Sequence, residues 1–146
     1  MVNHPSVSRE QQEAGKTLVN THSLKLGVPL EQEKTLDFGS GCTVKIDGYS
    51  ANPPILCEAW AHYGKPKGSQ PYKIMTDALK LIFTEKYLRK EHRKILLFSD
   101  EGARKPFVSK NWKAQFLREY SIETKVFPLP KKQREEVIEA QKRQYR

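Results

Sequence analysis

Two acidic residues stand within apolar stretches of the chain, on either side of the Asn-Pro-Pro segment at residues 52–54. Asp47 lies in a stretch at 42–49 that alternates apolar and polar residues, and Glu58 lies within a second alternating stretch at 55–63. Alternation with a period of two predicts β-strands. Proline cannot continue a strand ladder, so the Asn-Pro-Pro segment predicts the connection between them. Because an unpaired buried charge is costly, carboxylates on such strands indicate that a cation is held between them.

An antiparallel pairing of these two strands has a definite register. We expect Asp47 to stand opposite Glu58. In that register Cys57 faces Gly48, and Cys42 lies too far away for a disulfide. The alternating pattern places both cysteines on inward faces. We therefore expect two reduced thiols, and two cysteines are also too few for a disulfide-stabilised scaffold.

Length and charge bound the class of protein. A chain of 146 residues is long enough for one domain with one core. It holds no repeat and no Gly/Ser-rich linker that would mark a second domain. We expect a single domain over residues 1–146, with residues 1–7 as a flexible end. The net charge of +9 favours a polyanionic partner, which could be DNA, RNA or an anionic membrane surface.

The lack of recognisable targeting signals favours a cytoplasmic protein. The first residues lack the basic and apolar segments of a signal peptide. No apolar run approaches the roughly 20 residues of a membrane span. The low cysteine content fits a reducing compartment. We therefore expect a cytoplasmic protein without a membrane partner, which leaves nucleic acid as the expected polyanion.

The remaining pattern alternates helices and strands. Ser8 and Gln11 form a capping-box pattern that starts a helix reaching about Asn20. Residues 21–40 are compatible with a short edge strand, in which residues 24–30 alternate, or with an extended loop. Further helices are expected at about 70–90, 109–120 and 131–146, and further strands at about 94–100 and 123–128. The last two strands flank a helix and should pair in parallel. The sequence therefore predicts an α/β fold with a mixed central sheet flanked by helices.

The helix expected at 70–90 has two faces of different character. One carries polar residues at spacings of three and four, one above the next: Gln70, Lys73, Asp77 and Lys80. The other is apolar and should face the core: Met75, Ala78, Leu79, Ile82 and Phe83. The helix expected at 109–120 should turn Trp112, Phe116 and Leu117 inward. The polar face is of interest because this helix follows directly on the Glu58 strand.

Carboxylates on adjacent strands suit the hydrolysis of a phosphodiester. That reaction needs an activated water, a Lewis acid on the phosphate and stabilisation of the negative charge that develops. Asp47 and Glu58 could bind Mg²⁺ through oxygen, while water and substrate phosphate complete its octahedron. Mn²⁺ is the expected substitute for Mg²⁺. A nearby lysine would orient the water or neutralise charge.

On these residues the chain resembles the PD-(D/E)XK nuclease superfamily, which has the restriction-endonuclease-like fold. That pattern places an acid on one strand, then Glu-x-Lys on the next strand, then a helix. Asp47 matches the first acid and Glu58 the second, and the resemblance covers about residues 42–126 in element order. It implies a restriction-endonuclease-like core and a single nuclease-like domain that hydrolyses phosphodiester bonds in DNA with Mg²⁺.

The position that usually carries the motif lysine, two residues after Glu58, holds Trp60. Some members of the superfamily carry this lysine on the following helix, which implies Lys73 as the displaced residue and Gln70 one turn earlier. Lys45 is the alternative, because in the expected register it stands directly opposite Trp60. A lysine over an exposed indole is also an ordinary packing arrangement, worth about 0.5–1 kcal/mol. The resemblance therefore implies Lys73 as the catalytic lysine, with Lys45 as the second candidate.

Three classes of function remain open from the sequence. The first is a metal-dependent endonuclease acting on DNA. The second is a catalytically inactive nucleic-acid-binding module of the same fold, because Trp60 stands where the motif lysine is expected. The third is a small interaction protein whose positive charge is incidental. A homodimer is compatible with all three.

Overall fold

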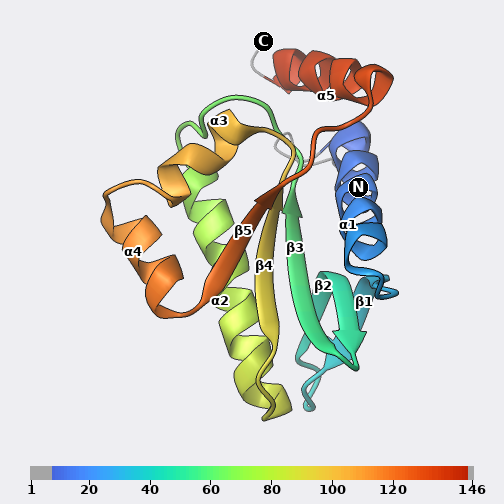
Figure 1. Cartoon of the computed structure of the whole chain (residues 1–146), viewed down its shortest axis with the longest axis vertical. Helices are drawn as coiled ribbons and strands as arrows, with labels where there is room; N and C mark the ends of the chain where they lie inside the picture. Colours follow the sequence, from blue (N-terminus) through green and yellow to red (C-terminus); the bar gives the residue numbers. More distant parts are fainter. Residues whose placement is uncertain (1–7, 145–146) are drawn as a thin grey trace.

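A five-stranded sheet, in the order β1-β2-β3-β4-β5, forms the centre of the part of the chain described by the computed structural model, residues 8–144 (Figure 1). Its strands are β1 (Glu31–Asp37), β2 (Thr43–Ala51), β3 (Pro54–Trp60), β4 (Arg93–Phe98) and β5 (Ile122–Val126). The helices are α1 (Arg9–Leu26), α2 (Gln70–Leu88), α3 (Glu101–Arg104), α4 (Trp112–Glu119) and α5 (Lys131–Gln144), with a 3₁₀ turn, η1, at Lys105–Phe107. The predicted α/β class is confirmed, whereas the flexible end predicted for residues 1–7 lies outside the described residues.

The sheet combines an antiparallel half and a parallel half. β1, β2 and β3 pair antiparallel, and β3, β4 and β5 pair in parallel. Gly48 faces Cys57 and Tyr49 faces Leu56, so the predicted register of the β2–β3 hairpin is confirmed. The predicted parallel pairing of β4 with β5 is also confirmed. The mixed sheet thus places the Asp47 strand and the Glu58 strand side by side.

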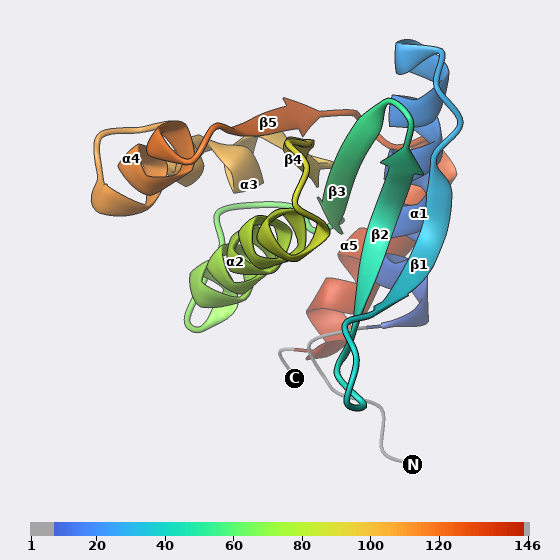
Figure 2. The ribbon, with the colours of Figure 1, turned by 90° about the horizontal axis from the view of Figure 1, so that it is seen from below.

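Helices cover both faces of the sheet. α1 and α5 lie on one face, and α2, α3 and α4 lie on the other (Figures 1 and 2). Successive residues of β3 and β4 point to opposite faces. Ile55 and Ile95 therefore join the core under α1, while Leu56 and Leu96 join the core under α2. A strand buried on both faces is apolar along its whole length, which explains the continuous apolar run of β4. Over residues 8–144, no helix combines the length and the apolar composition needed to cross a membrane.

The region after the first helix differs from the expectation. α1 continues past Asn20 to Leu26 and ends at Gly27, whose positive φ of 68° and N–H bond to the Leu24 carbonyl form a helix stop. Of the alternating residues 24–30, the first three are helical and residues 27–30 form a loop, so the edge strand considered for this segment does not form there. The edge strand is β1, seven residues further on and mostly polar. A polar edge strand protects a sheet from pairing with other chains, and its polarity also hides it from a search for apolar alternation.

Three large apolar side chains expected in the core are exposed instead. Leu79 and Phe83 lie outside because α2 packs on the sheet through Ile74, Met75, Ala78 and Leu81. Trp112 is 62 % exposed because it opens α4, and the buried residues of that helix are Ala114 and Leu117. Asn111 caps this helix by accepting a hydrogen bond from the Ala114 N–H at 2.9 Å. Trp112 is therefore a surface residue.

Both cysteines are free thiols, as predicted, but only one of them is internal. Cys57 is buried in β3, and burial raises the pKa of its thiol to about 12. Cys42 is exposed, because β2 begins one residue later at Thr43. The inward orientation expected for Cys42 is therefore wrong.

Candidate active site

The carboxylates of Asp47 and Glu58 lie side by side where the β2–β3 ladder opens. The pairing of the two strands runs from Ala51 with Pro54 to Gly48 with Cys57. Beyond it, the Asp47 N–H donates to Glu58 Oε2 at 2.8 Å, and the Ala59 N–H donates to Asp47 Oδ2 at 2.9 Å. Each carboxylate thus accepts a backbone hydrogen bond in the place of a strand carbonyl. The structure brings together the two acids that the sequence singled out.

Lys80 of α2 supplies the cation that contacts Glu58. The Glu58 side chain is only 2 % exposed and forms an ion pair with Lys80 through Oε1. Lys80 Nζ also donates to the Lys45 carbonyl at 2.9 Å, so it ties α2 to β2 and β3. Burial disfavours the charged form of Lys80, but Glu58, Asp77 and Asp47 outweigh this effect and hold its pKa above the ordinary value. A charged lysine is therefore part of the site.

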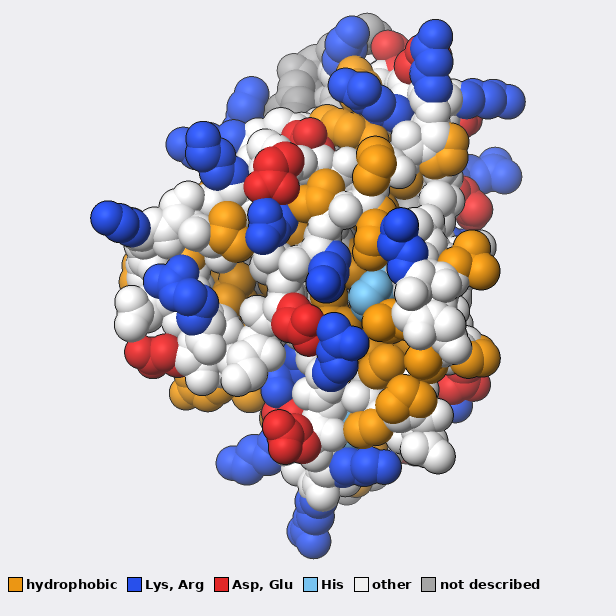
Figure 3. Space-filling model, viewed as in Figure 1, with side chains coloured by type: hydrophobic (Ala, Val, Ile, Leu, Met, Phe, Trp, Pro, Cys, Tyr) orange, Lys and Arg blue, Asp and Glu red, His pale blue; other side chains and the backbone are white. Residues whose placement is uncertain are grey.

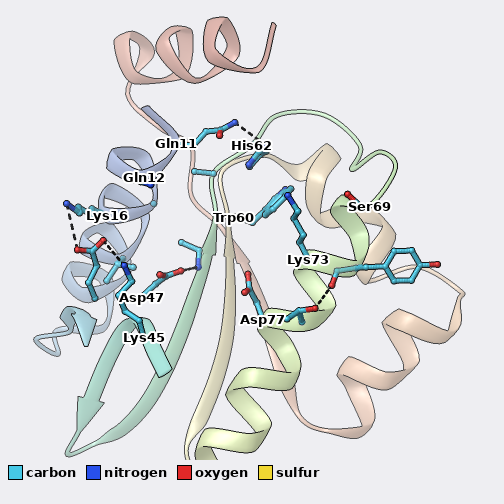
Figure 4. A pocket seen from close by; sticks show the side chains of 17 residues that line it. Gln11, Gln12, Lys16, Lys45, Asp47, Trp60, His62, Ser69, Lys73 and Asp77 are labelled. Atoms are coloured by element: carbon cyan, nitrogen blue, oxygen red, sulfur yellow. Dashed lines mark hydrogen bonds and ion pairs between the residues drawn. The ribbon is translucent and has the colours of Figure 1, made fainter. Parts of the chain in front are cut away.

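A third carboxylate, Asp77, lies one turn before Lys80 on α2. Asp77 and Asp47 reach the same pocket from opposite sides (Figure 4). Burial raises the pKa of Asp77 to about 7, with Lys80 opposing the shift and Asp47 adding to it. Burial, Asp47 and Asp77 likewise raise the pKa of Glu58 against the attraction of Lys80. When all these groups are ionised, three negative charges face one positive charge.

An open pocket of about 620 Å³ gives solvent access to this cluster (Figure 4). Its walls come from α1, from β1 and the first half of β2, from the end of β3, and from the first half of α2. The residues that line it include Gln11, Lys16, Lys45, Asp47, Trp60, His62, Tyr72, Lys73 and Asp77. The pocket is large enough for a phosphodiester with its neighbouring groups, and small-ligand sites are commonly about 300–1,000 Å³.

The three remaining predicted site residues differ in whether they line the pocket. Lys73 extends from α2 into the pocket toward Trp60 (Figure 4). Lys45 also lines the pocket, with its Nζ 3.9 Å from Glu33 Oε1. Gln70 begins α2 and its side-chain oxygen accepts the Lys67 N–H at 2.9 Å, so it stabilises the loop before the helix. The structure therefore places Lys73 and Lys45 in the pocket wall. Gln70 lies outside the wall, at the end of the loop that precedes α2.

Sequence reasoning missed the contact between Lys80 and Glu58, although it placed Lys80 on the polar face of α2. The available signal was the spacing, because Lys73, Asp77 and Lys80 follow one another along that face. Trp60 does not form the expected pair with Lys45. Its indole stacks on the His62 ring, with 3.9 Å between ring centroids and 13° between the planes.

His62 adds a neutral imidazole to the pocket wall. Burial lowers its pKa to about 4, and the nearby Lys73 contributes to the shift. Gln11 Nε2 lies 3.3 Å from His62 Nδ1. Because an amide nitrogen only donates, His62 Nδ1 accepts this bond and the ring proton resides on Nε2. At neutral pH the imidazole can therefore donate one hydrogen bond to an anion without carrying charge.

Replacing Asp77 with asparagine is expected to flatten the dependence of stability on pH. The pKa of Asp77 is about 7 in the folded protein, against an ordinary value of 3.8. Between these values the folded state keeps a proton that the unfolded state has lost. The resulting stabilisation is complete below pH 3.8 and is lost as the pH rises through about 7. Asparagine mimics the protonated form at every pH.

Urea unfolding of the wild type and of Asp77→Asn at about pH 4.5 and about pH 8 measures this effect. The variant should gain stability relative to the wild type at the higher pH and match it at the lower one. The exposed Asp37 provides a control, and Asp37→Asn should retain the wild-type dependence. An Asp77→Asn profile parallel to that of the wild type would contradict the raised pKa.

No family model, curated protein or solved structure matches this chain. Within residues 8–144, no group of three or more His, Cys, Asp or Glu side chains is arranged to hold a metal ion. The chemistry of the site is therefore the basis for assigning a function. Its main elements are two carboxylates on the pocket wall, a buried glutamate, a half-buried lysine and a neutral histidine.

Proposed function

We propose that the chain is a Mg²⁺-dependent endonuclease that hydrolyses phosphodiester bonds in DNA. The observation that carries this proposal is the clustering of three carboxylates, Asp47, Glu58 and Asp77, around Lys80 at the open end of the β2–β3 ladder, where burial and mutual repulsion raise the pKa of Glu58 and of Asp77. Buried like charges favour a bound cation, because it relieves both their repulsion and their desolvation. The net charge of +9 favours a polyanionic substrate. Lys and Arg side chains are spread over the face of the molecule in Figure 3.

The carboxylates of the site suit Mg²⁺. In phosphate chemistry this ion is usually held by one or two carboxylates, and water and substrate phosphate complete its coordination. Asp47 lines the pocket, whereas Glu58 is buried in the sheet beside it and accepts the Asp47 N–H. These two residues are the proposed ligands, with Asp77 facing them from α2. Mg²⁺ bound there would act as a Lewis acid on the phosphate and lower the pKa of a bound water.

Residues of this chain supply the other functions that the reaction needs. Lys73 reaches into the pocket and would neutralise charge on the phosphate, which is the role proposed for the displaced motif lysine. His62 would donate its Nε2–H to a phosphate oxygen. Lys80 holds Glu58 in place and balances part of its charge. Trp60 cannot carry a charge, and its stacking on His62 orients the imidazole instead.

The arrangement of elements also supports this proposal. An acid on β2, an acid on β3, the helix α2 and the strand β4 follow one another in the order of the PD-(D/E)XK pattern. A restriction-endonuclease-like core is therefore part of the proposal. The departures are Trp60 at the lysine position and the use of two lysines, Lys73 and Lys80, from one helix.

One observation favours a second candidate, a nucleic-acid-binding module without activity. The ion pair between Lys80 and Glu58 already gives the buried glutamate a cation. A site of this kind could remain folded without a metal ion. The two functions differ in whether the protein cleaves DNA or only binds it.

Incubation of the purified protein with supercoiled plasmid separates the two. We expect relaxed or linear plasmid in the presence of Mg²⁺ or Mn²⁺, and unchanged plasmid in the presence of EDTA. A matched preparation of Asp47→Asn serves as the control for contaminating nucleases. DNA binding without cleavage in either metal would favour the binding module, and the absence of both would leave only the interaction protein.

A further inference from the structure

Two exposed aromatic rings lie beside the pocket and share one cation. Tyr72 in the first turn of α2 is 61 % exposed, and Trp112 at the start of α4 is 62 % exposed. Lys113 Nζ lies 4.9 Å from the centroid of the Tyr72 ring and 4.9 Å from the centroid of the Trp112 ring. The ammonium thus holds together rings from two separate helices. We refer to Tyr72, Trp112 and Lys113 as the aromatic platform.

The aromatic platform is continuous with the pocket. Tyr72 belongs to both, because it lines the pocket that contains Asp47 and Asp77. Lys73, the next residue along α2, also lines that pocket. A ligand with one group in the pocket therefore has the Tyr72 ring at its edge and the Trp112 ring beyond it.

The charge around the platform matches a phosphate backbone. Lys113 lies between the two rings, and Lys65 and Lys67 are exposed in the loop that leads into α2. Aromatic rings combined with lysines form the usual surface for unpaired nucleic acid, since every base has a π-face that can stack on a ring. In a duplex those faces are covered by the neighbouring base pairs. A platform of this kind therefore distinguishes single strands from duplexes.

We propose that the aromatic platform binds unpaired bases of single-stranded DNA next to the phosphodiester that enters the pocket. This inference rests on the proposed function for the position of the phosphate, but binding at the platform requires no cleavage. It makes the substrate a single strand or an unpaired end, and one or two bases stack on Tyr72 and Trp112.

The test is a binding measurement in EDTA, so that no cleavage takes place. Fluorescence anisotropy gives the Kd for an oligothymidylate of about 12 nucleotides and for a duplex of the same length. Tyr72→Ala and Trp112→Ala should each raise the Kd for oligothymidylate by about 5- to 100-fold, as expected when a stacking ring is lost. The Kd for the duplex should change less than about 2-fold. Trp112→Phe keeps a ring and should retain most of the affinity.

The chain offers a matched control at the C-terminal end of α4. Tyr120, which follows α4, is 50 % exposed and packs in a tilted arrangement against Phe116, away from the shared Lys113 contact. Tyr120→Ala should bind oligothymidylate like the wild type. Thermal melting by circular dichroism verifies that each variant is folded.

The outcomes separate this inference from the proposed function. Platform variants that bind oligothymidylate like the wild type, or that lose affinity for single strands and duplexes equally, would overturn the inference even if the protein cleaves DNA. The latter result would indicate a general contribution to DNA binding or a surface for a protein partner. A selective loss for single strands supports the inference even if no cleavage occurs, in which case only the nuclease assignment fails.

Discussion

Replacing Lys80 with methionine is expected to lower the free energy of unfolding by about 3–5 kcal/mol at about pH 8, because it leaves a buried carboxylate without its partner. Glu58 is 2 % exposed and pairs with Lys80, which also holds the Lys45 carbonyl. Methionine has a similar length but can neither pair with Glu58 nor donate to this carbonyl. The measurement is urea unfolding followed by circular dichroism.

The loss should depend on pH in a defined direction. Without Lys80, burial and the neighbouring acids raise the pKa of Glu58 further above its ordinary 4.5, so the folded state keeps a proton that the unfolded state loses. The destabilisation therefore grows as the pH rises above about 4.5 and is smallest in acid. Glu58→Gln combined with Lys80→Met removes both charges and should recover part of the stability at about pH 8.

Lys86 provides the control for this prediction. It lies on α2 but is exposed, and Lys86→Met should change the free energy of unfolding by no more than about 0.5 kcal/mol. If Lys80→Met is also within about 1 kcal/mol of the wild type at about pH 8, the buried ion pair does not hold the site together.

Replacing Asp47 with asparagine should lower the cleavage rate by about 1,000-fold or more while leaving the fold intact. The carboxylate is a proposed Mg²⁺ ligand, and the charge stabilisation from a metal ion is worth several kcal/mol, each about 1.4 kcal/mol being tenfold in rate. The asparagine oxygen can still accept the Ala59 N–H, which is 2.9 Å from Asp47 Oδ2 in the wild type. Only the charge is lost.

A time course of plasmid nicking in Mg²⁺, with unfolding curves for the same preparations, measures both parts of this prediction. Lys73→Met should have a smaller effect of about 100-fold, comparable to the loss of one charge-stabilising donor. Asp37→Asn changes an exposed carboxylate in β1 and should cleave at the wild-type rate. Cleavage by Asp47→Asn at the wild-type rate would show that the site assignment is wrong.

Much of the sheet could be predicted because its information is local. Period-two alternation on both sides of the Asn-Pro-Pro segment located β2 and β3, and opposing Asp47 to Glu58 set their register. The apolar run of β4 indicated a strand covered on both faces. These signals depend on residues close in the sequence, so they can be recognised without knowledge of the tertiary contacts.

The missed features depend on contacts that no local pattern records. The position of β1 follows from the stop at Gly27 and from pairing with β2, and its polar residues carry no alternation to detect. Lys73 and Lys80 share one helix face, but they are separated by about two turns, roughly 10 Å. The position of α2 along the strands of the sheet determines which of the two lysines contacts Glu58. Trp112 is an apolar residue and was therefore expected in the core, but it is exposed because it lies in the first turn of α4.

The hydrogen bonds at the open end of the β2–β3 ladder also affect which single-base mutations of Asp47 and Glu58 the fold can tolerate. Asp47 and Glu58 each accept one backbone hydrogen bond, and the single amide oxygen of asparagine or glutamine could accept the same bond, although glutamine at position 58 would lose the ion pair with Lys80. Each acid differs from its amide by a single base in the codon. A descendant of this chain can therefore lose the charge of either residue in one mutational step and keep the hairpin that the residue completes. Changes to alanine or valine also need only one base change, but they would remove the hydrogen-bond acceptor as well and so destabilise the fold.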